Sequence, residues 1–180
     1  MELAQVRQVL DDRAIDRALT RMAAEIVERA QGTQDLALVG VRTRGVPLAS
    51  RLCSKIQLIE GHAVLQGALD ITLYRDDVAH SPRAVVRSTD VPFDVTGKIV
   101  VLVDDVLYTG RTVRAALDAL MDLGRPRAVR LAVLCDRGGR ELPVRADHIG
   151  VVVDALPHER VVVQLVATDG VDHVVIKGRP

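Results

Sequence analysis

Two neighbouring carboxylates follow a strongly apolar run, and a short turn that carries hydroxyl groups comes after them. Residues 100–103 are all valine or leucine, Asp104 and Asp105 come next, and residues 109–112 read Thr-Gly-Arg-Thr. Such a run predicts a strand buried on both faces of a parallel sheet, whose carboxyl end is where open α/β folds bind their ligands. We therefore expect the chemistry of this chain at that end of the strand.

The two carboxylates are the candidate catalytic residues. Carboxylate oxygens accept hydrogen bonds from a cis-diol such as the ribose hydroxyls, and their negative charge stabilises a cation that forms nearby. Asp104 and Asp105 are thus expected to face a sugar. The alternative is that the acids cap a helix and the turn is only a connection.

The turn is a candidate phosphate site. Apolar residues recur at helical spacing at Val113, Ala116 and Leu120, so residues 109–112 are expected to form the loop that enters a helix. The free N–H groups and the positive dipole at the start of a helix attract a phosphate. Gly110 would adopt a positive φ at little cost and let backbone amides close on the phosphate oxygens. Arg111 could contact the phosphate or equally remain solvated.

The strand, the acid pair and the Thr-Gly-x-Thr loop together resemble the phosphoribosyl pyrophosphate (PRPP) signature of type I phosphoribosyltransferases. The resemblance implies an α/β fold with a mostly parallel central sheet flanked by helices, a small hood and a flexible lid loop. Residues 75–94, with two prolines and little apolar periodicity, are the expected lid. The resemblance also implies that the 5-phosphate of PRPP is bound by Val106, Leu107, Tyr108, Thr109, Gly110, Arg111 and Thr112.

A second loop resembles the pyrophosphate-binding loop of the same enzymes. It reads Gly-Val-Arg-Thr-Arg-Gly at residues 40–45, after an apolar strand and before a helical pattern at residues 46–59. Arginine suits this role because its planar guanidinium makes fork-like contacts with phosphate oxygens. The residues expected to bind pyrophosphate are Val41, Arg42, Thr43, Arg44 and Gly45.

Three further segments, at residues 70–77, 106–108 and 136–147, resemble the family of bifunctional pyrimidine operon attenuators and uracil phosphoribosyltransferases. Membership implies transfer of uracil onto PRPP to give UMP and pyrophosphate, and control of pyrimidine genes through RNA in response to the uridine nucleotides UMP and UTP. By the same resemblance, backbone groups around Asp136 and Arg137 form the base pocket. A phosphoribosyltransferase for another nucleobase, or a regulator with little catalytic activity, is the alternative.

The reaction that this resemblance implies also indicates a cofactor. Departure of pyrophosphate leaves positive charge on the anomeric carbon and the ring oxygen, as in other glycosyl transfers. Mg²⁺ is the expected counterion, near Asp104 and Asp105 and still carrying several waters. The five histidines lie outside the matching motifs, and we assign no catalytic base.

RNA binding is the second hypothesis. Arg13, Arg17 and Arg21 recur every four residues, so a basic helix face could contact RNA phosphates, although acidic residues on the same helix also fit a solvated face. The family resemblance adds Thr20, Arg29, Arg140 and Arg145 as RNA-facing positions. Two residues depart from the family's pattern. Gly139 stands where a histidine is common, and Val151 stands where a lysine is common.

Composition limits the remaining possibilities. The chain of 180 residues has 24 basic and 24 acidic residues, so attraction to nucleic acid must come from local patches. We expect one domain over residues 1–180, no membrane span, and a cytoplasmic location because the first residues lack the pattern of a signal peptide. Cys53 and Cys135 are expected to be reduced and buried. A homodimer or higher homo-oligomer is expected on general grounds.

Periodicity predicts the remaining elements. A helix is expected from Asp11 or Asp12 to near Gly32, followed by a strand at residues 36–41 and a helix that ends near Glu60. Alternation at residues 63–73 predicts an extended, partly exposed arm. Further strands are expected at residues 128–134, 149–153, 161–166 and 174–176.

Overall fold

The computed structural model describes residues 6–76 and 87–178. A central sheet of five parallel strands has the order β3-β2-β4-β5-β6. These strands are β2 (Leu36–Val41), β3 (Leu65–Leu69), β4 (Ile99–Leu107), β5 (Ala128–Asp136) and β6 (His148–Val152). The predicted α/β fold with a parallel central sheet is confirmed. Half of the predicted lid, from residue 77 to residue 86, lies outside the described residues.

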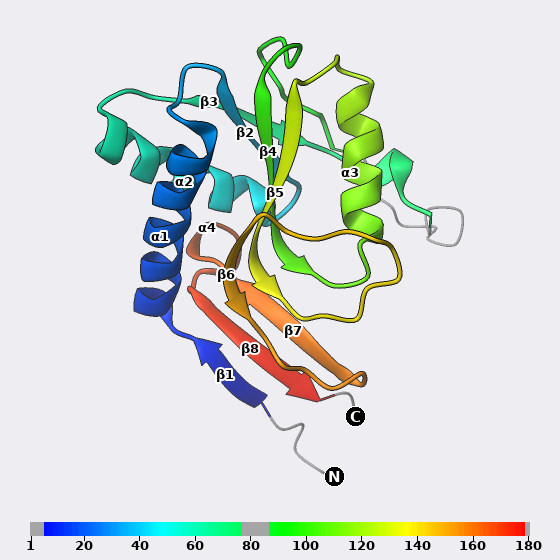
Figure 1. The fold of residues 1–180 in the computed structure, drawn as a ribbon. Helices are drawn as coiled ribbons and strands as arrows, with labels where there is room; N and C mark the ends of the chain where they lie inside the picture. The colour runs from blue at the N-terminus through cyan, green and yellow to red at the C-terminus, as the bar shows by residue number, and fades with distance from the viewer. Residues whose placement is uncertain (1–5, 77–86, 179–180) are drawn as a thin grey trace.

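Helices cover both faces of this sheet (Figure 1). Helices α1 (Asp12–Ala30) and α2 (Gly45–Glu60) lie on one face, and α3 (Arg111–Met121) lies on the other. Side chains of β4 alternate accordingly, because Val101 and Val103 pack in the core with α1 and α2, while Val100 and Leu102 pack in the core with α3. This two-sided burial explains why the strand is apolar at every position up to Asp104.

A second, smaller sheet forms the hood. Its antiparallel strands have the order β1-β8-β7, with β1 at Val6–Leu10, β7 at Glu159–Gln164 and β8 at His173–Gly178. The short helix α4 (Val166–Asp169) connects β7 to β8. Figure 1 shows this sheet below the central one, and a cavity lined by residues of β4, of β7 and of the loop after β5 lies between them.

The predicted helix boundaries agree with the local chemistry. The Asp11 side chain accepts a hydrogen bond of 2.7 Å from the Ala14 amide, which caps the start of α1. The helix ends at Gln31, which adopts a left-handed conformation immediately before Gly32. Buried residues on one face of α1 fix it against the sheet.

The arm expected at residues 63–73 is only partly right. Leu65–Leu69 does extend, but as the edge strand β3, whose backbone pairs in parallel with β2. Thr72–Tyr74 then forms a 3-10 helix, η1. Strand β1 and helix α4 were not expected from the sequence, because five and four residues are too few for a periodic pattern to be recognised. No helix within residues 6–76 and 87–178 has the length and apolar character that a membrane span requires.

The start of α2 packs directly on the backbone of the sheet. A Cβ at Gly40 would lie 2.5 Å from the Val46 Cα, and one at Gly45 would lie 2.2 Å from the Val103 carbonyl oxygen. Only glycine permits this approach at either position. The loop between β2 and α2 is therefore held close to the end of β4.

Substitution of Gly40 by alanine tests this contact. We expect Gly40→Ala to lower the free energy of unfolding by about 1–3 kcal/mol, because the added methyl group overlaps the α2 backbone. Gly178→Ala is the control, since a Cβ there meets nothing within 4 Å. Urea unfolding followed by circular dichroism measures both, and equal midpoints for the two variants would contradict the packing argument.

Candidate active site

Three loops that follow neighbouring parallel strands meet at one edge of the central sheet. Strand β4 pairs in parallel with β2 on one side and with β5 on the other, so their carboxyl ends lie together. The residues predicted to bind pyrophosphate lie at the end of β2 and in the loop after it, those predicted to bind the 5-phosphate lie at the end of β4 and in the loop after it, and Asp136 ends β5. The structure thus brings the three predicted groups of residues together.

The acid pair lies at the centre of this edge. Asp104 is buried, and its Oδ1 accepts a hydrogen bond of 2.9 Å from the Asp105 amide, while Asp105 Oδ1 accepts one of 2.8 Å from the Val106 amide. Burial raises the pKa of Asp104 well above its ordinary value, and repulsion from Asp105 raises it further. Burial also raises the pKa of Asp105. Ionised carboxylates in this position therefore need a positive charge beside them.

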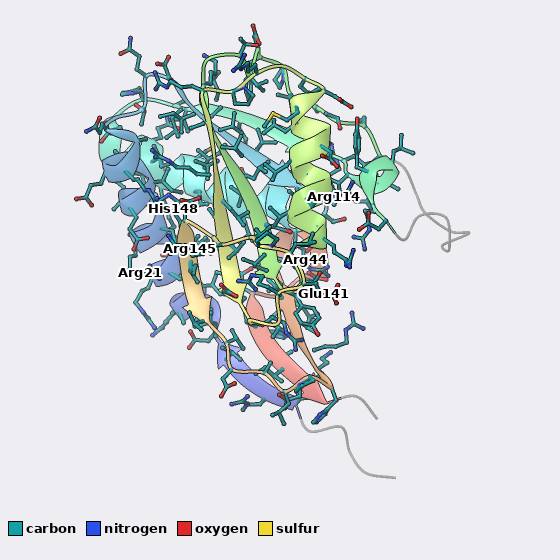
Figure 2. All side chains as sticks on the ribbon, turned by 45° about the vertical axis from the view of Figure 1, so that its right-hand side comes forward. Arg21, Arg44, Arg114, Glu141, Arg145 and His148 are labelled. Atoms are coloured by element: carbon teal, nitrogen blue, oxygen red, sulfur yellow. The ribbon has the colours of Figure 1, made fainter. Side chains whose placement is uncertain are left out.

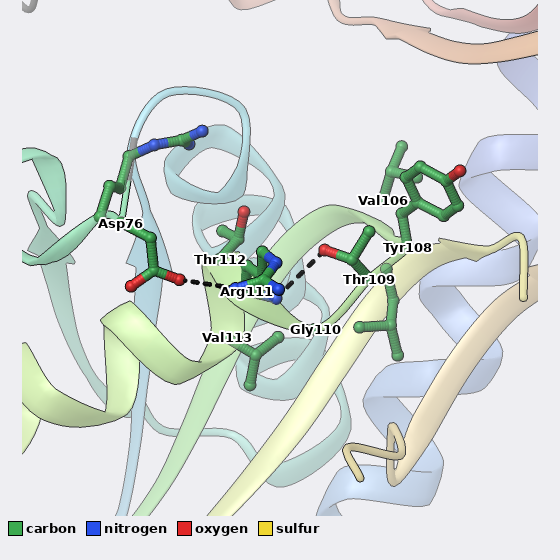
Figure 3. A pocket seen from close by; sticks show the side chains of 10 residues that line it. Asp76, Val106, Tyr108, Thr109, Gly110, Arg111, Thr112 and Val113 are labelled. Carbon is green, nitrogen blue, oxygen red and sulfur yellow. Dashed lines mark hydrogen bonds and ion pairs between the residues drawn. The ribbon is translucent and has the colours of Figure 1, made fainter. Parts of the chain in front are cut away.

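The loop after β4 forms a cavity of about 280 Å³ at the start of α3 (Figure 3). Gly110 is the N-cap of the helix, with a φ of 92°. The Thr109 hydroxyl accepts a bond of 3.3 Å from the Arg111 amide. Amides of the first helical turn have no partner within the helix and are available to an anion. Residues that line the cavity are Arg75, Asp76, Val106, Leu107, Tyr108, Thr109, Gly110, Arg111, Thr112 and Val113.

Arg111 is already paired at the rim of this cavity. Its Nε lies 2.6 Å from Glu141 Oε2 and its Nη1 lies 3.0 Å from Asp76 Oδ2. The pKa of Arg111 is raised by these carboxylates, first by the hydrogen bond to Glu141. Figure 3 shows the Arg111 side chain between Asp76 and Thr109. The structure therefore places Arg111 at the phosphate loop, with its charge compensated by two acids.

The loop at residues 41–45, which is predicted to bind pyrophosphate, brings together arginines from separate parts of the chain. Arg42 Nε donates to the Ser88 carbonyl at 2.9 Å, and Arg87 Nη1 donates to the Thr43 hydroxyl at 3.3 Å. Arg44 makes a forked contact with Asp169 of α4, at 3.2 Å from Nε and 2.7 Å from Nη2. Its charge also lies close enough to Asp105 to stabilise that carboxylate. A dense positive charge thus adjoins the acid pair.

A larger cavity of about 690 Å³ lies between the acid strand and the hood. The Arg137 guanidinium stacks on the Tyr108 ring at 4.0 Å from its centroid, and its Nη1 donates to the Glu159 carbonyl at 2.7 Å. The Arg137 Nε is buried without a partner among the described residues. The cavity is lined by Arg75, Val106, Tyr108, Arg137, Pro157, His158, Glu159, Arg160 and Val161.

The hood residues of this cavity were not identified from the sequence. His158, Arg160 and Val161 belong to no motif, and nothing in a local pattern shows that β7 faces the end of β4. Asp136, in contrast, was predicted for the base pocket and does lie at this edge. Its carboxylate accepts bonds from the Gly138 amide at 3.0 Å and from Arg140 Nη2 at 2.5 Å, which lower its pKa against the effect of burial.

The predicted RNA-facing residues occupy two different environments. Thr20, Arg29 and Arg145 are exposed, and Arg29 Nη2 lies 3.0 Å from Asp147 Oδ1. Arg140 instead points inward, with a side chain that is 22% exposed and Nη1 donating to the Tyr108 carbonyl at 2.8 Å. Figure 2 shows Arg145 in the same region of the molecule as Arg21, whose Nη2 bonds to the carbonyls of β6.

The cysteines have no part in this site. Both are free thiols; Cys135 is buried as predicted, whereas Cys53 is only partly buried. Burial raises the pKa of Cys53 to about 12 and that of Cys135 higher still. Neither is a nucleophile near neutral pH. Within the described part of the chain, no group of three or more histidine, cysteine, aspartate or glutamate side chains could enclose a metal ion.

Comparison with known proteins agrees with this arrangement. The family model described as phosphoribosyl transferase domain matches residues 5–165. A protein of Pelotomaculum thermopropionicum named "Bifunctional protein PyrR" is 63% identical over 172 residues, which cover 94% of each chain. The protein of the same name from Deinococcus radiodurans is 58% identical over 167 residues, covering 92% of this chain and 91% of that one.

The chain belongs to the PyrR family of phosphoribosyltransferase-domain proteins. The family predicted from the motifs is thereby confirmed, and the chain is a phosphoribosyltransferase, as expected. The name that its relatives carry also agrees with the expected combination of enzyme and regulator. The residues assigned to each role within the family stay predictions.

Solved structures share the fold. A hypoxanthine phosphoribosyl transferase of Trypanosoma cruzi superposes with a TM-score of 0.73 at 19% identity and covers 100% of this chain and 94% of that one. A hypoxanthine-guanine phosphoribosyltransferase of Bacillus anthracis gives a TM-score of 0.67 at 17% identity, covering 88% of each chain. These likenesses confirm the type I phosphoribosyltransferase fold.

The phosphate loop can be tested at Gly110. An alanine at this position would have a positive φ, which costs about 1–2 kcal/mol, and its Cβ would lie 3.3 Å from Leu142 and Val144. The loop would therefore shift, and we expect ribose 5-phosphate to bind about tenfold more weakly. Gly97→Ala is the control, because Gly97 also has a positive φ but nothing within 4 Å. Isothermal titration calorimetry compares the two. An unchanged affinity in Gly110→Ala would show that the phosphate binds elsewhere.

Proposed function

We propose that this protein transfers uracil onto PRPP to form UMP and pyrophosphate, and that it regulates pyrimidine genes through RNA in response to uridine nucleotides. The observation that carries the enzymatic part is the position of Asp104 and Asp105 between the two loops predicted to bind phosphate and pyrophosphate. A donor that carries a phosphate at one end and a pyrophosphate at the other would span these loops. Its ribose would then lie over the acid pair.

The phosphate loop holds the donor in place. Amides at the start of α3 and the Thr109 and Thr112 hydroxyls bind the 5-phosphate, with the helix dipole favouring its charge. The ribose hydroxyls donate to the carboxylates of Asp104 and Asp105. As pyrophosphate leaves, these carboxylates stabilise the positive charge that develops on the anomeric carbon and the ring oxygen.

The same carboxylates suit a magnesium ion. They are two hard oxygen donors whose ionised forms burial disfavours, so a divalent cation carried in with the donor would offset that cost. Mg²⁺ bound near Asp104 and Asp105 would neutralise charge on the departing pyrophosphate. Arg42, Arg44 and Arg87 would bind the pyrophosphate oxygens and keep the group oriented during its departure.

The cavity under the hood is proposed as the uracil site. Uracil is planar and has two carbonyl oxygens and two N–H groups, which match backbone groups of β7 and the loop after β5. The buried Nε of Arg137 would donate to a uracil carbonyl, which would remove the cost of an unsatisfied buried group. Uracil N1 then attacks the anomeric carbon. A different nucleobase would need other backbone or side-chain partners in this cavity.

Regulation through RNA is supported by the exposed basic residues that α1 and the loop before β6 contribute. Thr20, Arg29 and Arg145 would contact the leader RNA of pyrimidine genes, with arginines facing phosphates. Arg140 would act indirectly, because its guanidinium holds the loop that connects the RNA-facing region to Tyr108. UMP or UTP in the nucleotide site would stabilise this loop and so favour RNA binding.

We further propose that the protein acts in the cytoplasm, as one domain over residues 1–180 and as a homodimer or higher homo-oligomer.

The enzymatic proposal can be tested with the acid pair. We expect Asp104→Asn with Asp105→Asn to reduce UMP formation from uracil, PRPP and Mg²⁺ by about 10²–10³-fold, because the charge that stabilises the transition state is lost. Asp35→Asn is the control, since Asp35 is an exposed carboxylate at the opposite edge of the sheet. A panel of nucleobases in the same assay decides the base, and a folded wild-type protein inert toward all of them would refute an enzyme.

The regulatory proposal can be tested with two matched arginines. Arg29 and Arg127 are each about half exposed and each pairs with one aspartate, at 3.0 Å and 3.5 Å, on different parts of the surface. With UMP present, Arg29→Gln should weaken binding to pyrimidine leader RNA and lower the slope of log affinity against log salt by about 1, as loss of one phosphate contact requires. Arg127→Gln should leave both unchanged. Equal effects of the two substitutions would argue against this surface.

A further inference from the structure

Arg44, the N-cap of α2, and Arg51, within α2, reach across to the hood and pair with aspartates at the end of α4 and just after it. Arg44 pairs with Asp169 at 2.7 Å, and Arg51 pairs with Asp172 at 2.6 Å. Both aspartates also accept hydrogen bonds from the start of α4, Asp169 from the Leu165 amide at 3.0 Å and Asp172 from the Val166 amide at 2.8 Å. Both pairs join an arginine to the hood, although Arg51 also lies 3.7 Å from Asp16, and only Arg44 belongs to the loop predicted to bind pyrophosphate.

The backbone at Arg44 has little freedom. Gly45 lies so close to β4 that a Cβ there would be 2.2 Å from the Val103 carbonyl oxygen, and Arg44 is already the N-cap of α2. The long arginine side chain is flexible by contrast, with several rotatable bonds that cost entropy to order. The direction of the guanidinium must therefore be set by what it contacts.

Asp169 makes that contact, and its carboxylate is held in place by several hydrogen bonds. Its side chain is 15% exposed, and its Oδ2 accepts bonds from the Leu165 amide and from the Thr168 hydroxyl at 2.6 Å in addition to Arg44 Nε. The hydrogen bond from Arg44 is the largest of the causes that hold the pKa of Asp169 far below its usual range. A carboxylate fixed in this way holds the Nε and Nη2 edge of the guanidinium in one plane.

The remaining edge of the guanidinium is available to a ligand. Nη1 of Arg44 makes no hydrogen bond to any residue between 6 and 76 or between 87 and 178. The pKa of Arg44 is raised, first by its hydrogen bond to Asp169 and also by the nearby Asp105 carboxylate. The Arg44 side chain is 34% exposed, and Figure 2 shows it in the region where the central sheet meets the hood. A pyrophosphate next to the acid pair would meet this edge.

We propose that Asp169 is a positioning residue for the phosphoribosyl transfer reaction, which aims Arg44 at the pyrophosphate group of the donor. The inference rests on the proposed function, since it assumes that Arg44 binds pyrophosphate. It adds a residue from the hood to the pyrophosphate site, although Asp169 itself touches neither substrate. Through it, the sheet that covers the base cavity is joined to the loop that binds the leaving group.

The experiment compares Asp169→Asn with Asp172→Asn in the full-length protein. Each substitution removes one carboxylate of the hood that pairs with an arginine and keeps the side-chain volume, so both should lower the thermal midpoint to a similar extent. We expect only Asp169→Asn to weaken binding of pyrophosphate with Mg²⁺ by about five- to tenfold in calorimetry, because only it disorders Arg44. The KM for PRPP should rise by a similar factor while the KM for uracil changes by less than about twofold.

A double-substitution cycle supplies a further readout. Arg44→Lys keeps the charge but loses the forked contact, so its pyrophosphate affinity should resemble that of Asp169→Asn. The combined variant should bind pyrophosphate no more weakly than Arg44→Lys alone. Additive losses, or equal pyrophosphate affinities for Asp169→Asn and Asp172→Asn, would overturn the assignment. Because pyrophosphate binding is measured without turnover, a failure of the proposed base transfer would appear separately, as an inert wild-type enzyme.

Discussion

Strand β4 is covered by helices on both faces, so polar chemistry can appear only where the strand leaves the core. Val100 and Leu102 fill one face and Val101 and Val103 the other. Asp104 and Asp105 are the first charged residues after this run; Asp104 is still buried, and Asp105 is partly buried. The cost of ionising them there is offset in part by backbone amides and further by positive charge, which the neighbouring loop and an incoming metal-bound donor can supply. The remaining features of the site follow from this position.

Close backbone packing then determines where the neighbouring groups lie. Gly40 and Gly45 allow α2 to start directly against the sheet, which holds the arginine-rich loop beside the acids. Gly110 allows α3 to begin immediately after the acid strand, so that its free amides face the same space. Three short loops at neighbouring strand ends thereby form one site. The hood completes it by covering the cavity proposed for the base.

Much of this arrangement could be predicted from the sequence because it depends on local patterns. The strand at residues 36–41, the cap at Asp11 and the acid-glycine motif each have a chemical reason that is visible within a few residues. The base cavity could not be predicted in the same way. Its hood residues, such as Arg160 and Val161, reach β4 only through tertiary packing. Nor does any pattern show that Arg140 turns inward or that Asp169 meets Arg44, since 125 residues separate that pair.

The account as a whole depends on where the activated pentose binds. A crystal structure of the protein with PRPP and Mg²⁺ tests this directly. We expect the 5-phosphate at the amides that begin α3, the ribose hydroxyls on Asp104 and Asp105, and the pyrophosphate within reach of Arg44. Density for the donor at any other place on the protein, with these loops left empty, would contradict the account.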